Sequence, residues 1–271
     1  MNALTTKEIL EKVSASGDFK ATAPVWKLFL LAILAGAYIA FGAYASTMAS
    51  FNLVSNPATF GLGKMASAAV FPVGLMMVAL CGAELFTGNC LMVTGLFDKR
   101  FGVSRLLRNW VIVYAGNLVG SLLVAALINY TGLLGSGDGL LGAITIKTAI
   151  GKCGLDFGKA FVLGIFCNWL VCLAIWMATG AQVAIGKIFA IWFCIGLFIV
   201  AGFEHSVANM YFIPAGLIAS GNETWVQLLD LDLTNLTWGN FFLKNLLPVT
   251  LGNIVGGGLF VGTFYWVANR K

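Results

Sequence analysis

The chain has 271 residues, of which 59% are apolar and only 10% are charged, and its mean hydropathy is +0.91. About a quarter of the residues in a soluble domain are charged, so this composition leaves too little polar surface for a water-facing exterior. The net charge of +5 comes from short basic clusters beside apolar segments, without the long basic runs of nucleic-acid-binding tails. The composition therefore excludes a soluble or nucleic-acid-binding protein and predicts an integral membrane protein.

The chain is expected to begin with a cytoplasmic amphipathic segment, residues 1–25, whose short helix at Thr6–Val13 lies on the membrane surface. Mixed charge and a long following apolar run argue against a secretory signal peptide. Six apolar stretches long enough to cross a bilayer then follow. They fall at approximately 26–49, 65–97, 109–130, 159–179, 188–220 and 241–268, within one transmembrane domain of residues 26–268, which is followed by a cytoplasmic C-terminus at 269–271.

Lysine and arginine are unevenly shared between the two sides of the predicted membrane. An even number of crossings puts both termini on one side, which then holds eleven basic residues against five on the other. Basic residues favour the cytoplasmic side. Both termini are therefore expected in the cytoplasm, with the acidic loop of residues 222–235 outside.

The second and fifth apolar stretches are too long for a plain spanning helix. Each has 33 residues and is interrupted midway by polar and small residues. Both interruptions have the pattern Gly-x-Glu-x-x-x-x-Asn, with Gly82, Glu84 and Asn89 matching Gly202, Glu204 and Asn209. A second shared pattern, Gly-Asn-x-Val-Gly, begins at residue 116 and again at residue 252. The sequence therefore predicts two inverted three-helix repeats, about 26–130 and 159–268.

Interrupted helices at membrane depth predict a conduit, because irregular backbone is tolerated there only inside protein or beside a water-filled cavity. The amino ends of half-helices expose free N–H groups with partial positive charge, which suits a small anion. Glu84 and Glu204 would oppose such an anion. We interpret each carboxylate as an acceptor of backbone N–H bonds within its own loop, and a charge that faces the pore is the alternative.

His205 is the only histidine, and it lies at mid-depth in the fifth stretch. Ionisable groups inside a membrane are costly and usually functional, which favours a pore role over a structural one. Its imidazole can donate a hydrogen bond to an anion or lend it a proton. Thr87, in the other interruption, offers a hydroxyl to the pore, or equally a helix cap. Lys152, before the fourth stretch, would draw anions to the outer mouth, or is an ordinary solvated lysine.

Four motifs in chain order resemble those of the formate/nitrite transporter family. They are residues 81–89 (CGAELFTGN), 168–174 (NWLVCLA), 202–210 (GFEHSVANM) and 248–253 (PVTLGN). The resemblance covers essentially the whole chain. It implies an all-α, aquaporin-like protomer of six transmembrane helices with the second and fifth broken. It also implies a homopentamer with one pore per protomer in a bacterial or archaeal plasma (inner) membrane.

The resemblance also assigns residues to the pore. It implies a pore centre at His205 and Thr87 and a substrate pathway that includes Lys152 and Asn253, beside the polar residues of the two interruptions, Glu204, Asn209 and Asn89. It implies apolar constrictions at Leu85 and Phe198 on one side and at Phe71 and Leu75 on the other.

The expected substrates are small monovalent anions, formate first. Nitrite, hydrosulfide and short monocarboxylates such as acetate or lactate fit the same chemistry, and protons and the lipid bilayer are the further partners. In one cycle, anions gather near Lys152, pass Leu85 and Phe198, and take a proton from the imidazolium of His205 to cross as the neutral acid. In the other, the anion itself passes. The sequence leaves both open.

Other classes of protein explain the sequence less well. Asn56-Pro57-Ala58 matches the aquaporin tripeptide, but a water or glycerol channel needs two copies at mid-membrane, and this one predicts a turn between spans. The sequence has no G-x-S-x-G or H-E-x-x-H motif and no second histidine. It therefore gives no support to an enzyme, a metal site or a cofactor. A passive scaffold would not need His205 or two polar interruptions. The six cysteines form no C-x-x-C pair and are interpreted as small buried residues.

Overall fold

The computed structural model describes residues 3–270 as a bundle of helices, with no strand in that range. Met1, Asn2 and Lys271, the outermost residues of the predicted terminal segments, lie outside the described residues. Six helical segments are long and apolar enough to cross a membrane. They are Val25–Val54, Pro57–Cys81, Val103–Tyr130, Phe157–Gly180, Ala184–Ala201 and Trp238–Asn269. The prediction of an all-α protein with six transmembrane helices is confirmed.

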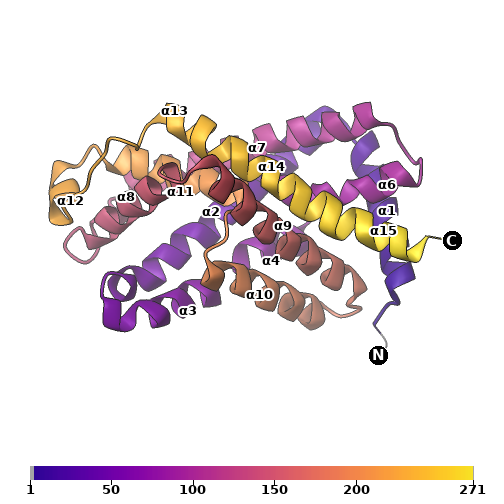
Figure 1. The fold of residues 1–271 in the computed structure, drawn as a ribbon, viewed down its shortest axis with the longest axis horizontal. Helices are drawn as coiled ribbons and strands as arrows, with labels where there is room; N and C mark the ends of the chain where they lie inside the picture. Colours follow the sequence, from indigo (N-terminus) through magenta and orange to yellow (C-terminus); the bar gives the residue numbers. More distant parts are fainter. Residues whose placement is uncertain (1–2, 271) are drawn as a thin grey trace.

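The first half of the chain contains helix α1 and three crossings (Figure 1). Its elements are α1 (Thr6–Thr22), α2 (Val25–Val54), η1 (Pro57–Thr59), α3 (Phe60–Val70), α4 (Val73–Cys81), α5 (Phe86–Asn89), η2 (Cys90–Met92), α6 (Val93–Phe97) and α7 (Val103–Tyr130).

The second half has the same plan, with a helix before its own three crossings. Its elements are η3 (Leu133–Gly135), α8 (Leu140–Cys153), α9 (Phe157–Gly180), α10 (Ala184–Ala201), α11 (Ser206–Ala219), α12 (Glu223–Leu228), α13 (Trp238–Asn240), η4 (Phe241–Leu246), α14 (Leu247–Ile254), η5 (Val255–Thr263) and α15 (Phe264–Asn269). The segments η4 and η5 are π-helical.

The two ends of the chain lie at the same end of the elongated bundle, and α8, α12 and α13 lie at the other (Figure 1). We call these ends the terminus side and the loop side. Glycines bring the helices of each repeat into close contact. A Cβ added to Gly120 would lie 2.0 Å from the carbonyl oxygen of Ile33, and one added to Gly256 would lie 2.2 Å from that of Ile165. The matching contacts support the inverted repeat.

Both predicted breaks are present, and each begins at a glycine. Gly82 ends α4 with φ +76° and Gly202 ends α10 with φ +79°, a left-handed conformation that glycine adopts without a steric cost. The extended residues that follow are held by a neighbouring helix. The amide of Glu84 donates to the carbonyl of Leu31 at 3.2 Å, and the amide of Glu204 donates to that of Leu163 at 3.3 Å.

Helix α1 differs from the predicted surface helix. It extends to Thr22, and its apolar residues Ile9, Leu10 and Val13 are buried. It packs against α9, η2 and α6. The protein, rather than lipid, therefore covers this apolar face.

Two smaller interpretations had different outcomes. The Asn56-Pro57-Ala58 tripeptide forms a turn, in which the Asn56 side chain accepts a hydrogen bond from the amide of Ala58 at 3.0 Å. Among the cysteines, Cys90, Cys153, Cys167 and Cys172 are buried as expected, but Cys81 is exposed. Cys81 lies at the end of α4, where the helix stops at the break.

Candidate functional site

Two cavities reach the two breaks from opposite ends of the bundle. The terminus-side vestibule has a volume of about 530 Å³, and residues of α1 line it together with Glu84, Leu85 and Asn89. The loop-side vestibule has a volume of about 480 Å³, and its lining includes Glu204 and His205. Each vestibule therefore ends at the helix break of a different repeat.

The two breaks meet at a buried pair of side chains, which we call the pore centre. Thr87 Oγ1 lies 2.9 Å from His205 Nε2, and both side chains are buried. His205 Nδ1 accepts a hydrogen bond from the amide of Ala208 at 3.0 Å, which caps the start of α11. A nitrogen that accepts carries no proton, so this bond assigns a neutral imidazole with its proton on Nε2.

The start of each half-helix is held by one asparagine from another helix. Asn117 Oδ1 accepts from the amide of Phe86, and Asn253 Oδ1 accepts from the amide of Ser206, both at 2.9 Å. Asn117 Nδ2 donates to the carbonyls of Ala32 at 2.8 Å and Glu84 at 2.9 Å. Asn253 Nδ2 donates to those of Gly164 at 2.8 Å and Glu204 at 3.0 Å. The first amide of each half-helix is therefore occupied, so the free N–H groups expected at these helix starts do not include it.

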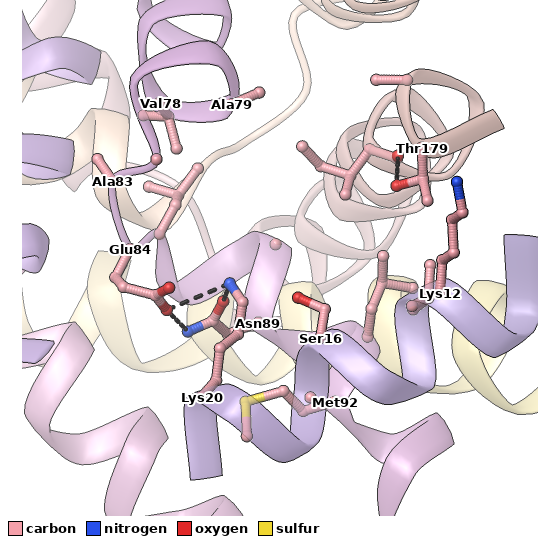
Figure 2. Close-up of a pocket in the computed structure, with 18 of the residues that line it drawn as sticks. Lys12, Ser16, Lys20, Val78, Ala79, Ala83, Glu84, Asn89, Met92 and Thr179 are labelled. Carbon is pink, nitrogen blue, oxygen red and sulfur yellow. Dashed lines mark hydrogen bonds and ion pairs between the residues drawn. The ribbon is translucent and has the colours of Figure 1, made fainter. Parts of the chain in front are cut away.

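Glu84 belongs to a cluster of polar side chains in the terminus-side vestibule (Figure 2). Lys20 Nζ lies 3.2 Å from Glu84 Oε2 and 2.6 Å from Asn89 Oδ1. Asn89 Nδ2 donates to Glu84 Oε2 at 2.8 Å and to Asn109 Oδ1 at 2.9 Å. Asn109 Nδ2 in turn donates a hydrogen bond to the backbone carbonyl of Lys20 at 3.2 Å.

The loop-side vestibule contains the matching cluster from the second repeat. Lys152 Nζ lies 2.8 Å from Glu204 Oε1, and Asn209 Nδ2 donates to Glu204 Oε2 at 2.6 Å. Asn209 Nδ2 also donates to Asn245 Oδ1 at 2.7 Å, and Asn245 binds the Lys152 carbonyl at 3.0 Å. The interpretation that the two glutamates accept backbone N–H bonds is wrong. Within residues 3–270 their carboxylates bind ammonium and amide side chains instead.

The sequence analysis missed Asn109 and Asn245 of these clusters, and it also missed Lys20. The offset of 132 residues that relates Leu31 to Leu163 also relates Lys20 to Lys152. Extending the repeat upstream of residue 26, to include α1 and α8, would have found it.

The apolar constrictions pair differently from the expectation. The rings of Phe71 and Phe198 pack edge to face with centroids 5.4 Å apart, and both line the loop-side vestibule. Leu75 and Leu85 line the terminus-side vestibule. Phe71 and Leu75 both lie on the second crossing, before its break. Phe71 is paired with Phe198, which lies just before the break of the second repeat, and Leu75 is paired with Leu85, which lies in the break of the first repeat. The expected pairs, Leu85 with Phe198 and Phe71 with Leu75, are therefore wrong.

Lysine outnumbers glutamate in both vestibules. Lys12, Lys20 and Lys187 line the terminus-side vestibule with Glu84, and Lys64, Lys147 and Lys152 line the loop-side vestibule with Glu204. In the described part of the chain only Lys20 and Lys152 of these six lie within 4.0 Å of a carboxylate. The excess positive charge raises the local concentration of anions. Residues 3–270 contain no group of three or more metal-ligating side chains.

The fold and the site define a class of protein. Two inverted repeats carry broken helices, and the breaks meet between two positively charged vestibules, which is the architecture of a multi-pass membrane channel or transporter. The sequence profile of the formate/nitrite transporter family matches residues 7–267. The chain belongs to this family, whose members are channels and transporters rather than enzymes.

Individual relatives support the same assignment. The probable formate transporter of Methanothermobacter thermautotrophicus is 44% identical over 272 residues, which cover 95% of this chain and 94% of the relative. The formate channel FocA of Escherichia coli K12 is 38% identical over 257 residues, covering 93% and 90%. The solved structure of a pentameric formate channel with formate bound has a TM-score of 0.82 at 35% identity, covering 91% of this chain and 98% of that one.

Proposed function

We propose that this protein is a channel for small monovalent anions and that formate is its principal substrate. The observation that carries the proposal is the contact of 2.9 Å between Thr87 and His205, which joins the two helix breaks between the vestibules. The names of the relatives support formate as the anion. Nitrite, hydrosulfide, acetate and lactate are the alternatives with similar chemistry.

We infer that the protein works as a homopentamer in the plasma membrane of a bacterium or archaeon, with both termini in the cytoplasm. The pentameric assembly of a similar channel supports the oligomer. Eleven basic residues on the terminus side against five on the other support the orientation. The loop-side vestibule then faces outward and the terminus-side vestibule faces the cytoplasm.

The proposed path connects the two vestibules through the pore centre. An anion collects in the loop-side vestibule near Lys152 and passes between Phe71 and Phe198. It then meets the Nε2–H of His205 and the hydroxyl of Thr87. These donors replace part of its hydration, which is lost at great cost in an apolar constriction. It leaves past Leu75 and Leu85. Asn253 holds the break, Glu204 and Asn89 bind the vestibule lysines, and Asn209 holds the carboxylate of Glu204.

The geometry favours passage of the anion over passage of the neutral acid. Proton transfer to formate would need an imidazolium at His205, but an imidazolium cannot accept the hydrogen bond that Nδ1 receives from Ala208. The charged ring would also be desolvated among buried side chains. In this account, His205 donates a hydrogen bond and keeps its proton.

Uptake into proteoliposomes tests the function. Formate, nitrite and hydrosulfide are compared between about pH 5 and pH 8, the range in which histidines titrate, for the wild type and His205→Ala. We expect formate to be fastest, to vary little with pH, and to fall sharply in the variant. Formate uptake that rises steeply as pH falls and collapses in the variant would support proton transfer instead. No uptake of any of the three anions above that of empty liposomes would overturn the proposed function.

A further inference from the structure

The strongest unexplained contact at the pore centre comes from the fourth crossing. Asn168 on α9 is fully buried, and its Nδ2 lies 2.7 Å from the carbonyl oxygen of Asn253 and 3.1 Å from that of Thr87. A carboxamide nitrogen has two hydrogens, so one side chain serves both carbonyls. Those carbonyls belong to different repeats. Asn168 therefore links the break that carries Thr87 to the helix that holds the break of His205.

The local backbone leaves the carbonyl oxygen of Thr87 able to accept the hydrogen bond from Asn168. After α5 the chain tightens into the 3-10 turn η2, and the amide of Cys90 divides its hydrogen bond between the carbonyls of Thr87 and Gly88. Tight turns of this kind make poorer hydrogen bonds than an α-helix. The S–H of Cys172, one turn after Asn168, adds a weak donor at 3.3 Å from the Thr87 carbonyl.

The space for the Asn168 side chain comes from a glycine on the opposite helix. A Cβ added to Gly257 in η5 would lie 2.5 Å from both Asn168 Nδ2 and Cys172 Sγ. The first repeat reverses the arrangement. Gly36 stands at the position equivalent to Asn168, and Ser121, at the position equivalent to Gly257, donates to the Gly36 carbonyl at 3.2 Å. The hydroxyl of Ser121 therefore binds a carbonyl of its own repeat and makes no link between the two repeats.

We propose that Asn168 is a positioning residue for anion passage, which holds the hydroxyl of Thr87 against His205. One end of the link is the backbone of Thr87. The other end is Asn253, whose side chain binds the amide of Ser206 and the carbonyl of Glu204, the two residues on either side of His205. Both partners of the pore-centre contact are thereby fixed to one buried amide. This inference rests on the proposed function, since it concerns the geometry of the same pore.

A double-mutant cycle separates this role from general stabilisation. Asn168→Leu fills the space without donors, Thr87→Val removes only the pore hydroxyl, and the cycle compares formate uptake by both single variants and the double variant. Asn168→Ser, whose hydroxyl is too short to serve both carbonyls, is measured in the same cycle, so that a failure of the leucine variant to assemble does not end the test. Ser121→Ala, which removes the equivalent polar group of the first repeat, is the matched control.

The expected result is a non-additive cycle. Replacing Asn168 alone lowers uptake about fivefold to tenfold, the effect of one or two net hydrogen bonds. In the Thr87→Val background the same replacement lowers it by less than about twofold, because the hydroxyl is already absent. Ser121→Ala leaves both the uptake and its pH profile unchanged. The inference is overturned if Asn168 variants lose the same factor in both backgrounds. A wild type without anion uptake would instead refute the proposed function itself.

Discussion

The two helix breaks have the same set of supporting polar residues, which we call the frame, but they differ in the side chains that they present to the pore. In both, a lysine, a glutamate and two asparagines form the same cluster, and a further asparagine holds the first amide of the half-helix. The residue after the glutamate differs: it is Leu85 in the first repeat and His205 in the second. Inverted duplication therefore explains the scaffold, and differences at equivalent positions, Leu85 against His205 and Thr87 against Val207, let the second break contribute an imidazole and the first a hydroxyl to the pore centre.

The two lysines also differ in the partners of their ammonium groups. The ammonium of Lys20 binds both Glu84 and Asn89, whereas that of Lys152 has only Glu204 as a hydrogen-bond partner among the described residues. The corresponding oxygen, Asn209 Oδ1, has no partner in that part of the chain. The ammonium of Lys152 thus has one hydrogen-bond acceptor fewer than that of Lys20, and it lies over the ring of Phe212, 5.3 Å from the ring centroid.

The largest effect is expected when the two breaks are made alike. His205→Leu places the residue of the first break in the second and removes the pore-centre donor. Hydrogen bonds to charged groups contribute about 1.5–3 kcal/mol, so formate uptake should fall about tenfold to a hundredfold. Stopped-flow uptake into proteoliposomes measures it, with exposed Cys81→Ser as a control. Unchanged uptake would remove His205 from the path.

The shared frame should be equally important to stability in both repeats. Asn117→Leu and Asn253→Leu each remove three hydrogen bonds at a buried site. At about 1 kcal/mol for each bond, each variant should lose about 3 kcal/mol of folding free energy. Denaturant titration in detergent checks this, with Asn129→Leu, on the half-buried end of α7, as a comparison. A large loss in only one variant would contradict the equivalence of the two frames.

The lysines should give a smaller effect that depends on the side. Lys152→Gln should raise the KM for formate approaching from the loop side about threefold to tenfold, since electrostatic attraction concentrates ions at a mouth. Lys20→Gln should change the KM from the terminus side less. Right-side-out and inside-out membrane vesicles separate the two directions, and raised ionic strength should weaken both effects. Equal changes from both sides in either variant would argue against separate capture sites.

The smallest effect concerns the start of α1. Hydrogen bonds from the Thr5 side chain and amide to Glu8 lower the pKa of that carboxyl. A lowered folded-state pKa means that the cap stabilises α1 fully above the ordinary pKa of glutamate, about 4.3, and is lost as pH falls through the lowered value. Hydrogen exchange of the first-turn amides should therefore quicken at acid pH. Glu8→Gln should abolish this pH dependence, and a pH dependence that persists would refute the assignment.

The sequence was enough to predict the breaks and the repeats, because glycine, glutamate and asparagine recur at fixed spacing in long apolar stretches. It could not predict the partners of Glu84 and Glu204, since Lys20 and Lys152 lie 64 and 52 residues away along the chain. The pairing of Phe71 with Phe198 likewise depends on how the second and fifth crossings pack. The neutral state of His205 depends on one amide, that of Ala208, whose direction only the folded backbone determines.

The most direct test of the central claim, that formate crosses as an anion past a neutral His205, is the voltage dependence of its uptake. Proteoliposomes at about pH 7, where formate is ionised, receive a membrane potential from a potassium gradient and valinomycin. The account predicts that an inside-positive potential drives accumulation, up to about tenfold for each 59 mV at equilibrium for a single charge, and that an inside-negative potential opposes it. Uptake that ignores the potential and follows the pH gradient would contradict the account and show that the neutral acid crosses.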